Sequence, residues 1–177
     1  CNTMALDTSA CPNVAVHTSF EAQNPSSWTY DFSASTYLGH AVEDWCSNVT
    51  SARERYGPAS AWEVGNVTDL SSLFDGKASF DEDINAWDVS KVTSMESMFR
   101  YTGTFNQPLS AWQVGQVTNF YGMFYSSALF NQDISAWNVT RATNMRYMIG
   151  TIGSSDFVDC NTMALDTSAC PNVAVHT

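Results

Sequence analysis

The amino-acid sequence predicts an α/β solenoid of about four coils, preceded by a helical N-terminal cap. Three observations carry this prediction. A 25-residue unit occurs three times in succession and begins a fourth time, its apolar residues follow first a strand pattern and then a helix pattern, and a separate helical pattern precedes the first copy. A fixed period of this length is typical of stacked units that bury their apolar faces against one another.

The segment before the repeats, residues 34–61, is predicted to form the helical cap. Its apolar residues recur every three or four positions, and residues 51–56 favour a second short helix that ends before Gly57 and Pro58. The residues at helical spacing are Leu38, Ala41, Val42, Trp45, Cys46 and Val49. Such a cap would cover the unpaired strand edge and the open apolar core at one end of the stack.

The repeats themselves, residues 62–150, are predicted to alternate a strand with a helix. In the second copy Ile84, Trp87, Val89 and Val92 follow the L-x-x-L-x-L-x-x-L spacing of a short strand that directs its side chains into a core. Strands of neighbouring coils would pair in parallel at roughly 4.8 Å, so equivalent aromatic residues would stack in ladders. The predicted ladder residues are Trp62, Trp87, Trp112, Trp137, Phe80, Phe105 and Phe130.

A helix of about two turns is expected after each strand. Met95, Met98 and Phe99 show the i, i+3, i+4 spacing of one helix face, and the other copies repeat this spacing. Thr93 precedes the segment as a candidate N-cap, and Glu96 three residues later completes a capping box. The candidate N-caps of the four copies are Thr68, Thr93, Thr118 and Thr143.

The aromatic ladders have two interpretations. Stacked rings could form an exposed platform for sugars, or they could form the core. We favour the core, because the aromatic positions interlock with the apolar positions of the predicted strand and helix. A single copy could not bury these residues alone, since so short a helix is marginal in water and a lone strand has no partner.

The consensus of the copies is specific enough to suggest a family. The second copy carries WDVSKVTSMESMF and FNQPLS, and the third ends in FNQDISAW. From about residue 38 to residue 150, the chain resembles the BspA-type surface proteins, with a leucine-rich-repeat-like unit of the form W-D-V-S-x-V-T-x-M-x-x-M-F-x-x-A-x-x-F-N-Q-x-I-S. The resemblance implies an extracellular or cell-surface role in adhesion and interaction, with no catalytic residues. The first copy departs with FDEDIN and the fourth lacks F-N-Q, so the repeats are expected to end near Gly150.

The two ends of the chain carry the same sequence. Residues 1–18, CNTMALDTSACPNVAVHT, return letter for letter as residues 160–177. We expect the chain to be one 159-residue period of a tandem array, followed by the start of the next period. A subunit with direct terminal repeats and a chain defined with a deliberate overlap are the alternatives. Residues 1–33 are then expected to join neighbouring units, and residues 151–177 to close the last coil or dock on the next cap.

The charge balance argues against several classes of partner. The chain has 18 acidic and 7 basic residues and a formal net charge of −11. Without the duplicated segment, one period has 17 acidic residues, because Asp166 repeats Asp7, and a net charge near −10. This charge opposes nucleic acids and anionic membrane surfaces as partners. No apolar run approaches the roughly 20 residues that span a bilayer, so we expect a soluble chain with no membrane span.

The five cysteines reduce to three in one period. None has the C-x-x-C or Cys/His spacing of a zinc site. Cys1 with Cys11, the same pair as Cys160 with Cys170, could close a small local loop, and an equally simple pattern joins Cys46 to one of the other two. Because three is an odd number, one thiol is expected to be free or intermolecular.

Three N-x-S/T sequons mark candidate glycosylation sites at Asn48, Asn66 and Asn138, provided that the chain passes through a eukaryotic secretory pathway. Asn66 and Asn138 lie within the repeats, where the V-T dipeptide is also explained by helix capping. Asn48 lies outside the repeats and is the strongest candidate. The abundance of Ser and Thr also permits O-glycans.

No catalytic, metal or cofactor site is predicted. The acidic run at 81–83 could bind calcium, but it lacks the regular D-x-D-x-D-G spacing, so a solvated loop is favoured. The histidines accompany no nucleophile motif and no acid/base constellation, so an enzyme is not expected. These histidines are His17, its copy His176, and His40.

The function that we expect is structural. Units that associate head to tail without closing form a filament, so the chain is expected to build an extracellular fibre or cell-surface appendage and to carry glycans. The alternative is a surface adhesin or receptor module that binds a protein or a glycan through the solenoid face. The two hypotheses differ in self-association, because a fibre protein polymerises or is covalently continuous, whereas an adhesin is a monomer with a partner.

Overall fold

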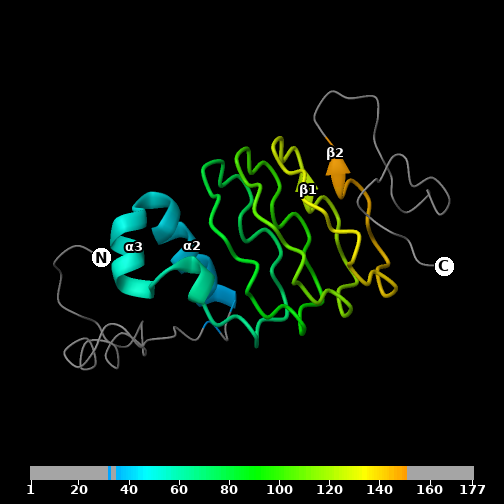
Figure 1. Cartoon of the computed structure of the whole chain (residues 1–177), viewed down its shortest axis with the longest axis horizontal. Coiled ribbons are helices and arrows are strands. Elements are labelled where there is room, and N and C mark those ends of the chain that lie inside the picture. The colour runs from blue at the N-terminus through cyan, green and yellow to red at the C-terminus, as the bar shows by residue number, and fades with distance from the viewer. Residues whose placement is uncertain (1–31, 33–34, 151–177) are drawn as a thin grey trace.

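The computed structural model describes Phe32 and residues 35–150, which form two helices followed by a row of extended copies (Figure 1). Helix α2 spans Ser35–Ser47 and helix α3 spans Val49–Tyr56. A short 3-10 helix, η1, spans Ala59–Ala61. The segments predicted to join units and to close the last coil, residues 1–33 and 151–177, lie outside this description except for Phe32.

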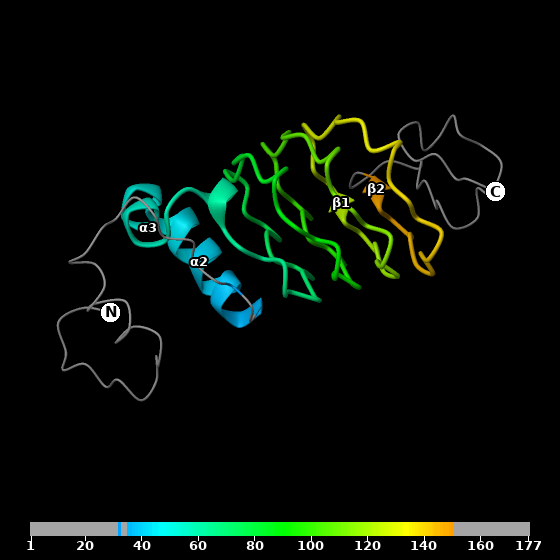
Figure 2. The same cartoon turned by 60° about the horizontal axis from the view of Figure 1, so that its bottom comes forward.

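Helices α2 and α3 form where the apolar spacing predicts them, and they lie against one end of the row of copies (Figure 2). Asn48 caps α3 by accepting a hydrogen bond from the Ser51 amide at 3.1 Å, and Gly57 ends the helix with φ 72°. Trp62 of the first copy packs against the edge of Trp45, at 5.5 Å between ring centroids. The helices thereby cover the apolar core at this end.

The four copies are joined through segments that lie side by side. We call residues 69–76, 94–101, 119–126 and 144–150 the paired segments. Parallel bridges join Asp69 to Ser94, Ser94 to Asn119, and Asn119 to Asn144. The last two segments also contain the strands β1, Phe124–Tyr125, and β2, Ile149–Gly150, which form a parallel two-stranded sheet.

The predicted positions of strand and helix within each copy are wrong. The tryptophan segment predicted as a strand contains two turns and no strand, and in the first turn the Trp87 amide donates to the Ile84 carbonyl at 3.0 Å. The parallel pairing lies instead in the segments predicted as helices, and no α-helix forms between residues 62 and 150. The copies therefore contact one another through the backbone of turns and short parallel bridges, and the described helices precede the copies.

A left-handed residue in the middle of each paired segment explains why no helix forms there. Ser72, Ser97, Gly122 and Tyr147 occupy equivalent positions and have φ values of 58°, 54°, 60° and 56°. An α-helix requires right-handed dihedral angles throughout. Alternate amides of the paired segments donate to the following copy instead of to the carbonyl four residues back. So short a helix is marginal on its own, and the bonds between copies replace it.

The threonines predicted as N-caps form a ladder instead. The hydroxyl and the amide of Thr93 both donate to the Thr68 carbonyl, at 3.0 and 2.8 Å. Thr118 and Thr143 repeat this arrangement, each on the threonine of the preceding copy. The capping box is absent, since the Glu96 carboxylate accepts from the Asn119 side chain at 2.7 Å.

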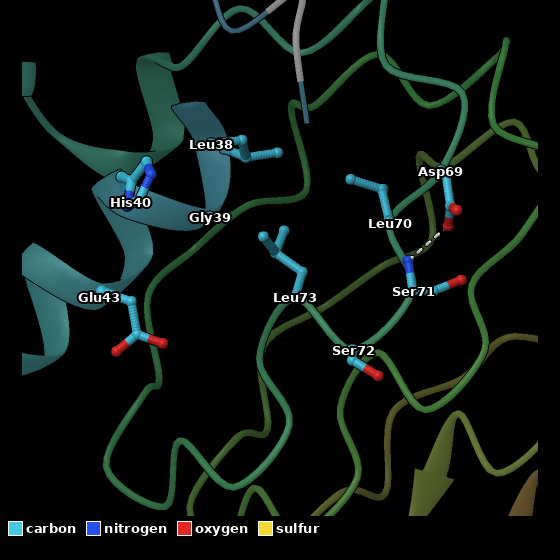
Figure 3. Close-up of a pocket in the computed structure, with 9 residues that line it drawn as sticks. All are labelled: Leu38, Gly39, His40, Glu43, Asp69, Leu70, Ser71, Ser72 and Leu73. Atoms are coloured by element: carbon cyan, nitrogen blue, oxygen red, sulfur yellow. Dashed lines mark hydrogen bonds between the residues drawn. The ribbon is translucent and has the colours of Figure 1, made fainter. Parts of the chain in front are cut away.

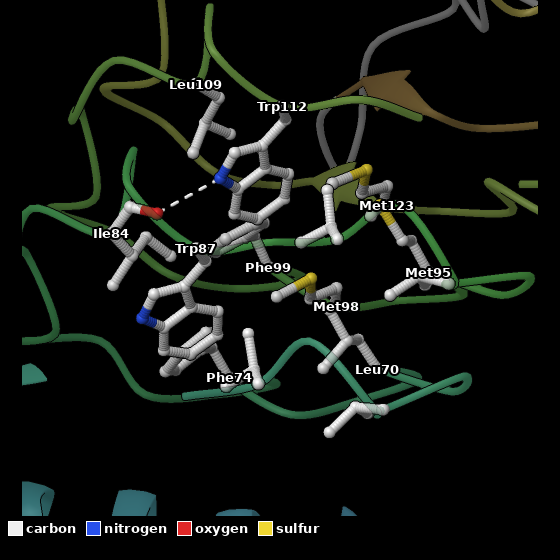
Figure 4. Close-up of a cluster of buried hydrophobic side chains, with 14 of the residues drawn as sticks. Leu70, Phe74, Ile84, Trp87, Met95, Met98, Phe99, Leu109, Trp112 and Met123 are labelled. Atoms are coloured by element: carbon white, nitrogen blue, oxygen red, sulfur yellow. Dashed lines mark hydrogen bonds between the residues drawn. The ribbon is translucent and has the colours of Figure 1, made fainter. Parts of the chain in front are cut away.

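The predicted ladder residues lie in the core, where equivalent rings stack between copies (Figure 4). Phe99 stacks on Phe74 at 5.2 Å and on Phe124 at 5.4 Å between centroids. Trp112 stacks on Trp137 at 6.2 Å, and its indole nitrogen donates to the Ile84 carbonyl at 3.0 Å. Phe130 is half-buried, and the other six predicted ladder residues are buried. These rings are core residues and do not form an exposed platform.

Candidate functional site

Four tyrosines gather on the outward side of the paired segments and line a hollow of about 230 Å³. Tyr101 comes from the second copy, Tyr121 and Tyr125 from the third, and Tyr147 from the fourth. Tyr101 is 40% exposed, and the other three are half-buried. We call these four residues the tyrosine cluster. It brings together side chains that are up to 46 positions apart in the sequence.

The rings of the tyrosine cluster meet edge to face in an unbroken row. Tyr101 lies 5.9 Å from Tyr125 at 77°, Tyr125 lies 6.4 Å from Tyr147 at 74°, and Tyr147 lies 5.6 Å from Tyr121 at 87°. Aromatic pairs prefer this arrangement, which holds the rings without burying them. The result is a set of ring faces at right angles around one small hollow.

Two arginines extend the tyrosine cluster. The guanidinium carbon of Arg100 lies 5.4 Å from the ring centroid of Tyr101, and that of Arg146 lies 5.6 Å from the ring centroid of Tyr147. Arg100 is held in place by Asp75 of the first copy, with 3.0 Å between Nε and Oδ1. This hydrogen bond raises the pKa of Arg100 further above its usual value. Of the seven basic residues of an acidic chain, Arg100 therefore lines the hollow and Arg146 lies on one of its tyrosines.

The backbone at two members of the cluster is unusual for an aromatic residue. Tyr101 and Tyr147 have φ values of 59° and 56°, in the left-handed region that bulky residues rarely adopt. The other copies place Gly or Ser at the equivalent positions. These residues are Gly76 and Ser126 for Tyr101, and Ser72, Ser97 and Gly122 for Tyr147. Strained backbone of this kind collects at functional sites, which marks the cluster as a candidate.

The chemistry of the hollow suits binding. Its lining offers ring faces, phenol hydroxyls and the Arg100 guanidinium, and Gly122 completes it. Within the described part of the chain, no group of three or more His, Cys, Asp or Glu residues is placed to hold a metal ion. Rigid aromatic side chains with a polar end are the common anchors of recognition surfaces.

The predicted glycosylation sites are all exposed but lie far apart in the chain. Asn48 caps α3, Asn66 accepts a hydrogen bond from Lys91 at 2.6 Å, and Asn138 accepts one from the Thr140 amide at 3.2 Å. Each asparagine uses its side-chain oxygen, and its amide nitrogen makes no hydrogen bond within residues 35–150. A glycan on that nitrogen is compatible with this geometry.

Of the predicted disulfide residues, the structure describes Cys46 alone. Cys46 is half-buried in α2 and forms no disulfide with a described residue. Burial raises the pKa of its thiol. The remaining candidates lie outside the described residues. They are Cys1, Cys11, Cys160 and Cys170.

The acidic run at 81–83 has structural partners. Asp81 accepts a hydrogen bond from the Asn106 amide at 2.9 Å, and Asn106 accepts one from the Asn131 amide at 3.1 Å in the next copy. In the first copy, Asp81 therefore supplies the hydrogen-bond acceptor that Asn106 of F-N-Q supplies in the second copy. Glu82 lies 3.7 Å from Arg53 of α3, which ties this run to the helices.

The fold and site define a class: a protein of short paired copies around stacked aromatic rings, with two helices at the N-terminal side and a tyrosine cluster outside. The chain belongs to the family described as Mycoplasma protein of unknown function, DUF285, whose model matches residues 40–158. The match includes most of α2, all of α3 and the four copies. Neither a curated protein nor a solved structure matches this chain.

Proposed function

We propose that this chain is a surface recognition unit that binds a carbohydrate through the tyrosine cluster. One observation carries the proposal: all four tyrosines of the copies meet at one outward hollow, whereas the tryptophan and phenylalanine rings pack in the core. The resemblance of the repeats to BspA-type surface proteins supports an extracellular or cell-surface setting. No helix within residues 35–150 has the length and apolar character needed to cross a bilayer.

The proposed architecture is a solenoid of four coils. It is supported by hydrogen bonds between positions 24 or 25 residues apart, which recur from each copy to the next. Ring stacking between equivalent residues, such as Phe80 on Phe105 and Phe105 on Phe130, both at 6.1 Å, has the same period. In this architecture the outward side chains of several coils form one surface, which is how solenoid proteins bind their partners.

The ligand class follows from the lining of the hollow. Ring faces pack against the C–H groups of a sugar, while phenol hydroxyls and a guanidinium bond to its hydroxyls. Arg100 is already paired with Asp75, so the site does not require an anionic ligand. The volume of about 230 Å³ is below the roughly 300–1,000 Å³ of sites for drug-sized ligands. We therefore assign to the hollow one neutral sugar ring of a longer glycan.

The test is a glycan array followed by titration of the best ligand into a Tyr101→Ser/Tyr147→Ser variant. Serine occupies equivalent positions in other copies, so the fold is expected to persist. We expect the variant to bind at least about tenfold more weakly. Leu129→Ser is the control, because Leu129 is 57% exposed and is not part of the cluster. If no glycan binds, or if the double variant binds as well as the control, the proposal is wrong.

A second candidate is the structural role, in which glycosylated units associate head to tail into a fibre or surface appendage. The observation that favours it is the identity of residues 1–18 and 160–177. Electron microscopy of native material, with its mass under denaturing and reducing conditions, tests it. Filaments made of chains far heavier than 19.5 kDa would establish a tandem array. Filaments that separate into chains of about that mass would indicate non-covalent assembly, and discrete monomers would exclude the fibre.

A further inference from the structure

The amide hydrogen bonds between the paired segments all run in one direction. In the first segment, residues 70, 72, 74 and 76 donate their amides to the carbonyls of residues 94, 96, 98 and 100 at 2.8–3.0 Å. The second and third segments donate to their successors in the same way. Each paired segment therefore presents amide donors toward the following copy and carbonyl acceptors toward the preceding one.

This polarity leaves an edge of acceptors at the first copy. The carbonyls of Asp69, Ser71, Leu73 and Asp75 are equivalent to the carbonyls that accept bonds in every later copy. Within the described residues, no donor reaches these four carbonyls. We call them the acceptor edge. A row of unpaired backbone groups is a template for a further segment, and this row can pair only with a segment that donates.

A groove lies in front of the acceptor edge. It has a volume of about 400 Å³, with Leu38, Gly39, His40 and Glu43 of α2 on one side and residues 69–73 on the other (Figure 3). Helix α2 does not supply the missing donors, because the amides along a helix interior bond to its own carbonyls. The groove therefore separates three of the acceptor carbonyls from the helix that covers the adjacent core.

The electrostatics of the groove favour a cationic occupant. The Asp69 carboxylate lies at the groove, where it accepts a hydrogen bond from the Ser71 amide at 2.8 Å. Glu43 is paired with Lys77 at 2.6 Å, so this pair adds little net charge. The carbonyl row adds partial negative charge. A second copy of this chain carries a net charge of −11 as well, so repulsion opposes it as the occupant.

We propose that the groove binds a basic peptide segment of a partner protein, which lies along the acceptor edge in the conformation of the paired segments and directs alternate amides toward it. Alternate residues of the segment donate their amides to the carbonyls of Asp69, Ser71 and Leu73, so about five residues are engaged. Lysine or arginine side chains of the segment lie near the Asp69 carboxylate. This site lies at the N-terminal side of the copies and is independent of the tyrosine cluster.

The first test uses a fluorescein-labelled heptapeptide of alternating lysine and valine, titrated into the full chain and followed by fluorescence polarisation. In two further versions of the peptide, either the valines or the lysines carry backbone N-methyl groups. Each version lacks one alternating set of amide donors but keeps the charge of the parent peptide. We expect the parent peptide to bind and at least one methylated version to bind about tenfold or more weakly. Equal binding of all three would mean attraction by charge alone and would overturn the proposal.

Two substitutions locate the peptide. Asp69→Asn keeps the acceptor for the Ser71 amide and removes the charge, so we expect several-fold weaker binding. Asp133→Asn is the matched control, because Asp133 accepts from the Ser135 amide at 2.9 Å in the same way but lies in a later copy. An equal loss in both variants would contradict the proposal.

Gly39→Phe fills the groove from the side of α2, since no atom lies within 4 Å of a Cβ added there. We expect it to abolish peptide binding, whereas Thr50→Phe, at an exposed position of α3, leaves binding unchanged. Unchanged binding in Gly39→Phe would place the peptide elsewhere. If the free chain dimerised with increasing concentration and Gly39→Phe abolished this dimerisation, the groove would bind a second copy of the chain. That result would also overturn the proposal.

Discussion

The inward and outward positions of the paired segments differ in how much their residues vary between copies. One inward position carries Phe74, Phe99 and Phe124 in three successive copies, whose rings stack on one another. The outward position that carries Tyr121 in the third copy carries Ser, Glu and Arg in the others. An inward side chain packs on its own counterpart, so a change in one copy affects the next. An outward side chain has no such constraint, which leaves the outer surface free to differ between copies.

The same comparison separates stability from recognition. The Phe99 ring is fully buried and contacts Phe74, Phe105 and Phe124, whereas Tyr101 is 40% exposed and meets Tyr125 edge to face. Buried rings contribute most of the stabilisation by area, while rings in a shallow hollow contribute contact surface for a ligand.

The largest effect is expected from Phe99→Ala, which removes the central ring of the stack. Truncating a buried phenylalanine costs about 3–5 kcal/mol of unfolding free energy. Urea denaturation followed by tryptophan fluorescence measures the loss. Glu96→Ala, at an outward position of the same segment, is the control and is expected to change the free energy by about 0.5 kcal/mol or less. Similar losses in both variants would show that inward and outward positions are equivalent.

A second prediction compares two buried tryptophans that differ in one hydrogen bond. The Trp112 indole donates to the Ile84 carbonyl, whereas the buried Trp62 indole nitrogen has no partner in the described structure. Trp112→Phe removes this bond, although the carbonyl still accepts from the Trp87 amide, so it is expected to cost about 0.5–1.5 kcal/mol more than Trp62→Phe. Paired urea denaturation curves measure the difference. An equal cost would mean that the bond adds nothing to the stacking.

A third prediction concerns the helices that cover the first copy. Burial raises the pKa of Tyr56 to about 12, and the hydrogen bond from its hydroxyl to Asp44 at 2.7 Å acts in the same direction. Because folding raises the pKa of this phenol, its neutral form stabilises the folded state fully at pH values below the unfolded pKa near 10. This contribution is lost as the pH rises toward 12. The stability of the wild-type chain should therefore fall between these values. The stability of the Tyr56→Phe variant should fall less over the same pH range. Parallel curves of stability against pH for the two proteins would contradict the assignment of the effect to Tyr56.

The helices were predictable from the sequence because their signals are local. Asn48 and Gly57 mark the start and end of α3 by their own conformations, and the apolar spacing of α2 is visible in a single segment. The structure of the copies was not predictable, because Met95, Met98 and Phe99 have the spacing of a helix face although their segment forms turns that bond to the neighbouring copies. The bonds that decide the matter join residues 24 positions apart, and no pattern within one copy reveals them.

The tyrosine cluster was missed for a related reason. The recurring rings are the tryptophans of four copies and the phenylalanines of three, and these rings pack in the core rather than forming an exposed platform. The cluster residues occupy different positions in different copies. Tyr121, Tyr125 and Tyr147 have different offsets from their tryptophans, so only the fold unites them. Aligning the copies to find positions that change, rather than positions that repeat, would have marked these residues.

The smallest effect on stability is expected from Tyr147→Gly, in the tyrosine cluster. The left-handed conformation of Tyr147, with φ 56°, costs about 1–2 kcal/mol, and glycine removes that cost. The variant also loses edge-to-face contacts with Tyr121 and Tyr125, each contributing about 0.5–1.5 kcal/mol. The two terms oppose each other, so the unfolding free energy should change by only about 1 kcal/mol. Glycan binding, measured on the same sample, should be lost, because one wall of the hollow is gone. If Tyr147→Gly destabilised the chain as much as Phe99→Ala, the outward tyrosines would be part of the core, and the division between stability and recognition would fail.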